Sequence, residues 1–89
     1  MTDIWIDRAA KQRVLEGVRK YGVIDLFKDH RCFIQEATEE LLDSMNYLQW
    51  AFGKNQITLE DHRWMTSSIR LVIEGLVKCC PKNNLGKDE

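Results

Sequence analysis

The only proline of the 89-residue chain is Pro81, and its position is the strongest constraint on the fold. Proline inside a helix kinks or breaks it, so the eighty residues before Pro81 are free to form long helices. The chain has just five glycines, and its apolar residues recur in staggered groups without strict alternation. That spacing is typical of amphipathic helices and not of strands. We therefore predict an all-α fold.

The sequence indicates three helices followed by a tail. The predicted helices span residues 4–21, 30–52 and 59–79, and together they form one helical domain over residues 1–80. The remaining segment, 81–89, has too little apolar surface to pack against a core. We expect it to form a flexible tail.

Local signals mark most ends of these helices. Gly22 follows the first apolar stripe and suits the position just after a helix C-terminus. The second helix can begin at Asp29 or His30. The Thr58 hydroxyl can cap the third helix, and the side chain of Asp61, three residues later, can bond back to the Thr58 backbone in a variant of the capping box.

Composition excludes several classes of partner. The net charge is −1 with 30% charged residues, so no long-range field attracts nucleic acid or anionic lipid. No apolar run approaches the roughly 20 residues that cross a bilayer, and the N-terminal segment lacks the apolar core of a signal peptide. Three cysteines, an odd number with Cys79 and Cys80 adjacent, make a poor disulfide framework. We expect a cytoplasmic protein that binds neither nucleic acid nor membrane.

The second predicted helix carries an unusual concentration of acid. Four carboxylates fall within eight residues and no basic residue lies among them: Glu36, Glu39, Glu40 and Asp43. They form four like-charged pairs at i,i+3 or i,i+4, each destabilising a helix by roughly 0.2–0.5 kcal/mol. A divalent cation would relieve this repulsion, because Mg²⁺ and Mn²⁺ prefer carboxylate oxygens. Alternatively, lysines and arginines of the first helix neutralise the acids.

Helical periodicity sorts the second helix into faces. The core face is expected to hold Ile34, Ala37, Leu41, Met45, Leu48 and Phe52. On a different side lies what we call the acidic face, formed by Glu36, Glu40, Asp43, Tyr47 and Trp50. Because this face carries two large aromatic residues, we expect it to pack against another helix. Acids on a packed face need partners, since burying an unpaired carboxylate is unfavourable.

The third helix has a wide apolar side. Its core face is expected to hold Met65, Ile69, Val72, Leu76 and Cys79. Trp64 and Leu71 lie at the margin of this stripe. We expect them to widen the intramolecular core, and the alternative is that they meet another subunit.

The segment EATEELLDSMNYL, Glu36 to Leu48, resembles the acidic helix of the MazG-like all-α nucleoside triphosphate pyrophosphohydrolases. In that superfamily an E-x-x-D follows an E-x-x-E and ends in an apolar run containing an aromatic residue. Glu40-x-x-Asp43 matches the E-x-x-D, and Glu36-x-x-Glu39 can stand for the E-x-x-E. Upstream, RKYG resembles the segment before this helix in small phage and prophage members. The resemblance covers about a third of the chain, from Arg19 to Trp50.

The resemblance implies a Mg²⁺- or Mn²⁺-dependent hydrolase that converts a nucleoside triphosphate or related nucleotide to monophosphate and pyrophosphate. The implied metal ligands are Glu36, Glu39, Glu40 and Asp43, and three of them are the implied catalytic residues: Glu36, Glu40 and Asp43. Lys20 or Lys54 would contact the phosphates, and the base would be bordered by Asn46, Tyr47 and Trp50. For both lysines the alternative is a solvated surface role, and for Trp50 it is a core or subunit interface.

The sequence departs from the family pattern in one respect. The usual members carry the two acidic pairs on separate helices, whereas here both pairs lie on one helix. Acids of the third helix, Glu60, Asp61 and Glu74, lack the E-x-x-D spacing. Either the metal site is reduced, or a second chain completes it in a homo-oligomeric helical bundle, a dimer or tetramer as the family commonly forms.

Two further interpretations involve no catalysis. The chain can be a helical interaction or regulatory protein of phage or mobile-element type, whose acids bind a basic partner and whose Trp50 anchors an interface. It can also be a degenerate MazG-like member that keeps the fold without the chemistry. Turnover in the presence of Mg²⁺ separates these alternatives from the hydrolase.

Overall fold

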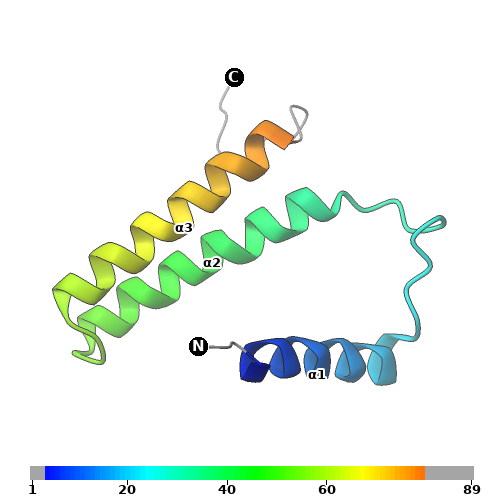
Figure 1. Cartoon of the computed structure of the whole chain (residues 1–89), viewed down its shortest axis with the longest axis horizontal. Helices are drawn as coiled ribbons and strands as arrows, with labels where there is room; N and C mark the ends of the chain where they lie inside the picture. Colours follow the sequence, from blue (N-terminus) through cyan, green and yellow to red (C-terminus); the bar gives the residue numbers. More distant parts are fainter. Residues whose placement is uncertain (1–3, 80–89) are drawn as a thin grey trace. The chain divides into compact units, whose positions relative to one another are not determined.

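A computed structural model describes residues 4–79 of the chain (Figure 1). This part contains three helices and no strand: α1 (Ile4–Tyr21), α2 (Phe33–Gly53) and α3 (Leu59–Cys79). The predicted all-α fold is confirmed for these residues. None of the three helices is long and apolar enough to cross a membrane. The predicted tail at 81–89 lies outside the described residues.

The chain divides into two compact units, residues 1–30 and residues 31–89. The sequence had suggested one domain over residues 1–80. Unit one contains α1, whose bounds coincide with the predicted range 4–21. Unit two contains α2 and α3 packed against each other.

Gly22 ends α1 as the sequence predicted. Its backbone N–H donates to the Val18 carbonyl oxygen at 2.9 Å, and its φ is +87°. This left-handed conformation is open to glycine and strained for residues with a Cβ. The first helix therefore stops where glycine allows the chain to turn.

Asp25 organises the connection after α1. Its carboxylate accepts the Phe27 N–H at 3.1 Å, and its carbonyl oxygen accepts the N–H groups of Lys28 and Asp29 at 3.0 and 2.9 Å. Asp29 thus belongs to this turn and does not cap α2. The second helix begins three residues later than the predicted range 30–52, with Cys32 at its N-cap and no side-chain capping bond there.

A Schellman-type turn joins α2 to α3. The Gln56 N–H donates to the Ala51 carbonyl oxygen at 2.8 Å, and the Asn55 N–H donates to that of Phe52 at 3.0 Å. Asn55 has a φ of 62°, a left-handed conformation that asparagine tolerates better than most residues. The chain reverses within these few residues, and α2 and α3 form an antiparallel hairpin (Figure 1).

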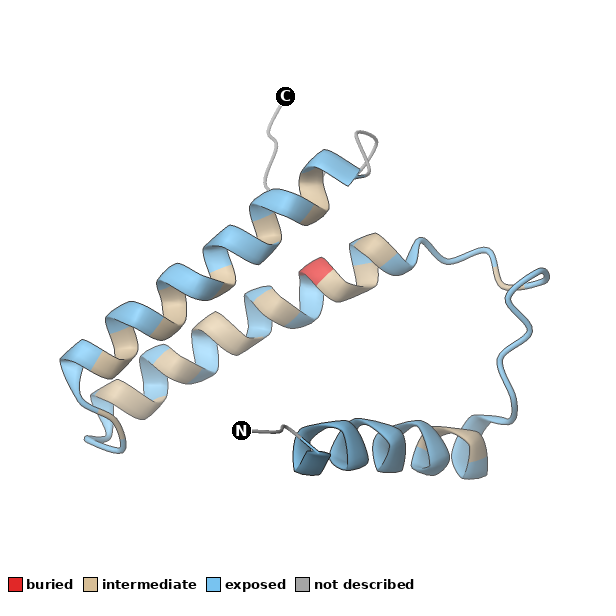
Figure 2. Ribbon diagram, in the orientation of Figure 1, coloured by how far each residue is buried: buried red, intermediate tan, exposed pale blue. Residues whose placement is uncertain are grey.

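Half-buried residues line the facing sides of this hairpin (Figure 2). All six residues predicted for the α2 core face are among them, and across the interface the Phe52 and His62 rings lie 5.4 Å apart between centroids. On α3, Met65, Ile69 and Leu76 are half-buried as predicted.

Two residues predicted for the α3 core face, Val72 and Cys79, are exposed. Ile73 is half-buried where Val72 was expected, because the contact with α2 follows steps of three and four residues through Ile69, Ile73 and Leu76. Trp64 and Leu71 were expected to widen the core and are instead exposed.

The hairpin has a thin core. Among residues 4–79 the one buried side chain is Thr38, whose hydroxyl donates to the Ile34 carbonyl oxygen at 2.8 Å. No apolar side chain in this part of the chain is fully buried. Two helices in contact along one stripe leave their other sides open, so apolar residues remain on the surface.

Candidate acidic site on α2

The acidic face lies on α2 away from its contact with α3. Steps of 100° per residue place Glu36 and Asp43 roughly opposite the stripe through Ile34 and Leu41, and Glu40 about a third of a turn away from that stripe. Glu40 and Asp43 are exposed, and Glu36 is half-buried. The three carboxylates therefore form a row that α3 does not cover.

Glu39 differs from the other three acids. It is exposed, and its carboxylate accepts a weak hydrogen bond from the Gln35 amide nitrogen at 3.4 Å, one turn earlier on the same helix. Its angular position lies to the side of the row formed by Glu36 and Glu40. Glu39 lies one turn before Asp43 at i,i+4, so these two carboxylates are neighbours on the helix, whereas Glu36 lies two turns away from Asp43.

The aromatic end of the acidic face is also open. Tyr47 is 68% exposed and Trp50 60% exposed. Their rings meet edge to face, with centroids 5.5 Å apart and planes at 88°. Such a pair offers a flat ring surface to another molecule. Asn46, one position before Tyr47, is exposed as well.

One chain does not bring a complete ligand set together. Across residues 4–79, no group of three or more histidine, cysteine, aspartate or glutamate side chains is arranged to hold a metal ion. Within the hairpin, no lysine or arginine forms an ion pair with the row of acids on α2. The chemistry of the carboxylates suits Mg²⁺, but their placement along one helix supplies neighbouring pairs and not a cage.

The two lysines singled out as phosphate contacts lie in different units. Lys54 directly follows α2 and is exposed. Lys20 lies on α1, where its ammonium group is 5.9 Å from the centroid of the Tyr21 ring.

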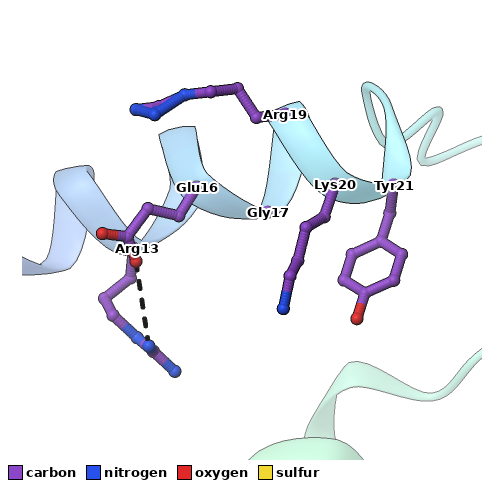
Figure 3. A pocket seen from close by; sticks show the side chains of 6 residues that line it. All are labelled: Arg13, Glu16, Gly17, Arg19, Lys20 and Tyr21. Atoms are coloured by element: carbon purple, nitrogen blue, oxygen red, sulfur yellow. Dashed lines mark ion pairs between the residues drawn. The ribbon is translucent and has the colours of Figure 1, made fainter.

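Lys20 also borders a surface hollow along α1 that the sequence analysis had not identified (Figure 3). Its lining comes from a single helix: Arg13, Glu16, Gly17, Arg19, Lys20 and Tyr21. Arg13 and Glu16 form an ion pair at 3.9 Å. The sequence pattern that could have predicted this hollow is the spacing of Arg13, Gly17 and Lys20, at i, i+4 and i+7. This spacing places a residue without a side chain between two cations on one side of α1.

No family model matches the chain, and no match was found among curated proteins or solved structures. The interpretation of the acidic face therefore depends on its own residues and on their geometry.

Proposed function

We propose that the protein is a Mg²⁺-dependent nucleotide pyrophosphohydrolase that works as a homo-oligomer in the cytoplasm. The observation that carries this proposal is the row formed by Glu36, Glu40 and Asp43, which lies along α2 and is left uncovered by α3. The resemblance of this helix to the MazG-like acidic helix supports the same chemistry. Mn²⁺ is the alternative ion, since it takes the same oxygen ligands.

The proposed ligands are Glu36, Glu40 and Asp43, with Glu39 as an auxiliary. A bound Mg²⁺ supplies neutralisation of phosphate oxygens and activation of the water that attacks phosphorus. The carboxylates would hold this ion and so position the phosphate chain. Cleavage between the α- and β-phosphates gives a nucleoside monophosphate and pyrophosphate.

The remaining proposed contacts concern binding of the nucleotide. Trp50 and Tyr47 would stack on or border the base, and Asn46 would hydrogen-bond to it. Lys20 or Lys54 would contact the phosphates as a point charge. These roles follow from residue type and from the exposure of the side chains.

A second chain is needed for this activity. Because the acids of one chain lie along one side of a single helix, carboxylates of another copy must complete the ligand set. A dimer or tetramer in which two α2 helices face each other would do so, and it would also cover Tyr47 and Trp50.

One observation favours a second candidate function, that of a non-catalytic helical interaction protein. The exposed pair of Tyr47 and Trp50 lies beside unpaired acids, as a surface for a basic helical partner would require. In this case the acids bind lysines or arginines of the partner and no turnover occurs. A degenerate MazG-like member would behave in the same way toward nucleotides.

The test is release of pyrophosphate from a panel of canonical and modified nucleotides in the presence of Mg²⁺ or Mn²⁺. Glu40→Gln and Asp43→Asn should each reduce turnover by about 100-fold or more, since a metal contributes several kcal/mol to such a reaction. The matched control is Glu74→Gln, which removes one exposed carboxylate from α3 and should leave turnover unchanged.

The outcomes separate the candidates. Turnover that is lost in both α2 variants and kept in the control supports the hydrolase. Absence of turnover with every nucleotide, together with a thermal midpoint that Mg²⁺ does not change, favours the interaction protein. Full activity in both α2 variants would show that the ligands lie elsewhere.

A further inference from the structure

The outer side of α3 carries a second stripe, which we call the outer stripe: Trp64, Ser68, Leu71 and Gly75. Their spacing of i, i+4, i+7 and i+11 places them on one side of the helix, roughly opposite the contact with α2 through Ile69 and Ile73. Trp64 is 57% exposed and Leu71 69% exposed. Two large apolar side chains thus alternate with two small residues on a surface that the hairpin does not use.

Gly75 has no explanation within its own chain. A Cβ built at this position meets no atom within 4 Å, so nothing in the hairpin requires a glycine. In a helix interior glycine is less favourable than alanine by about 1 kcal/mol. The missing side chain instead leaves a depression in the outer stripe, one turn beyond Leu71.

The polar group of Trp64 already has a hydrogen-bond partner within α3. Its indole N–H donates to the Asp61 carboxylate at 3.1 Å, one turn earlier on α3. A buried tryptophan needs a partner for this donor, and here its own helix supplies one. The ring can therefore be covered by an apolar surface without leaving an unpaired polar group.

We propose that the outer stripe is the contact with a second copy of this chain, with the two α3 helices antiparallel across a twofold axis. In the register that sets Trp64 against Gly75 of the second copy, Leu71 lies against Ser68 of the second copy. Each large side chain then enters the space beside a small one, twice over by symmetry. The outer stripes of the two copies are therefore complementary in side-chain size.

Charge supports the same register. It brings Lys78 of one copy opposite Asp61 of the other and next to Glu60, so opposite charges meet at both ends of the contact. A parallel arrangement would set Trp64 against Trp64 and Lys78 against Lys78. Size and charge therefore both select the antiparallel pair.

This contact is independent of the proposed hydrolase activity. It uses the outer side of α3 and leaves the acidic face of α2 open, because the two surfaces lie on opposite sides of the hairpin. If the acidic faces also meet in pairs, two different twofold contacts generate a tetramer. A dimer through α3 alone would still form in a protein without catalytic activity.

The test is sedimentation equilibrium of the full chain and of Gly75→Leu. We expect a dimer for the unmodified protein, or a tetramer if the acidic faces also pair. The dissociation constant of the α3 contact should be about tenfold higher or more in the variant, since a side chain forced into a packed contact is unfavourable. A Cβ at this position has no neighbouring atom within 4 Å outside the adjacent turns of its own helix, and leucine is a better helix former than glycine. Helix content measured by circular dichroism should therefore be kept, which excludes unfolding as the cause.

Two further variants control the experiment. Arg70→Leu places the same leucine on an exposed position of α3 outside the outer stripe and should leave the dimer intact. Leu71→Ser should weaken the dimer, and the double variant Ser68→Leu with Leu71→Ser should restore it, because large still meets small in the proposed register.

Restoration by this exchange supports the register directly. A monomeric unmodified protein at micromolar concentration would overturn the proposal. So would a Gly75→Leu variant that dimerises as tightly as the unmodified protein, since the copies would then meet through another surface.

Discussion

At the scale of single residues, Thr58 shows how one side chain fixes the start of a helix. Its hydroxyl oxygen accepts the Asp61 N–H at 3.0 Å, which is the cap that the sequence predicted. The capping box would have the Asp61 carboxylate accept the backbone N–H of Thr58, but this carboxylate instead accepts the Trp64 indole N–H. Asp61 thus links the start of α3 to its outer stripe.

Replacement of Thr58 by alanine should lower the free energy of unfolding of the hairpin by about 0.5–2 kcal/mol, because an N–H of the first turn loses its acceptor. Thr58→Ser keeps a hydroxyl and should recover most of this loss. The measurement is urea unfolding followed by circular dichroism. Equal losses for alanine and serine would show that the hydroxyl does not stabilise the helix.

Two glycines of the first unit should respond in opposite directions to alanine. Gly17 lies inside α1 with open space at its Cβ position, so Gly17→Ala should raise helix content by removing a penalty of about 1 kcal/mol. Gly22 has a φ of +87°, so Gly22→Ala should strain the end of α1 by about 1–2 kcal/mol. Circular dichroism of the two variants at several temperatures tests the pair, and a gain of helix with Gly22→Ala would contradict the account.

At the scale of elements, α2 is a helix with two unlike sides. One side carries the apolar residues that contact α3, and the other carries a row of like charges: Glu36, Glu40 and Asp43. Tertiary contact with α3 holds the helix together against the repulsion along its other side. Metal binding or a basic partner would remove this repulsion, which is why both candidate functions act through the same face.

Removing the repulsion between the acids of α2 should change the free energy of unfolding in a predictable direction. Glu40→Gln removes two like-charged pairs and should stabilise the metal-free protein by about 0.4–1 kcal/mol at low salt. Glu74→Gln on α3 should destabilise it slightly, because Glu74 is spaced i,i+4 from both Arg70 and Lys78. Both effects on the free energy of unfolding should be smaller at high salt, because salt screens the charges. A destabilising Glu40→Gln under metal-free conditions would contradict this reading of α2.

Local signals explain which parts of the elements could be predicted. Gly22 and Thr58 act on neighbouring residues, so the end of α1 and the start of α3 follow from the sequence alone. The start of α2 did not, because Asp29, one of the two residues at which the helix was expected to begin, belongs to the turn around Asp25. Periodicity also predicts that Glu40 lies on the same side of α2 as Glu36, and its role as a metal ligand stays a prediction.

The site beyond these local patterns could not be predicted. Which sides of a helix stay open depends on contacts between elements, and the exposure of Trp64 and Leu71 appears only when α2 and α3 are seen packed together. Whether a second chain completes the ligand set around Asp43 depends on contacts between molecules, which one sequence does not encode by spacing alone.

At the scale of the whole molecule, the described helices bury little apolar surface. Among residues 4–79 no apolar side chain is fully buried, and many large ones are exposed on all three helices. Small domains with thin cores depend on additional sources of stability, of which oligomerisation is one. We expect self-association to be coupled to folding.

The thermal midpoint should therefore rise with protein concentration, because association stabilises the folded state by mass action. Circular dichroism melts across a hundredfold range of concentration test this, and Gly75→Leu should show a weaker dependence than the unmodified protein. A midpoint that stays constant over the whole range would contradict the coupling.

The most direct test of the central claim, that the acidic face of α2 binds Mg²⁺, is calorimetric titration of Mg²⁺ into the full chain. We predict saturable binding to the unmodified protein and to Glu74→Gln, and loss of that binding in the double variant Glu40→Gln with Asp43→Asn. Binding that is absent from the unmodified protein, or that persists in the double variant, would contradict the assignment of these carboxylates as metal ligands.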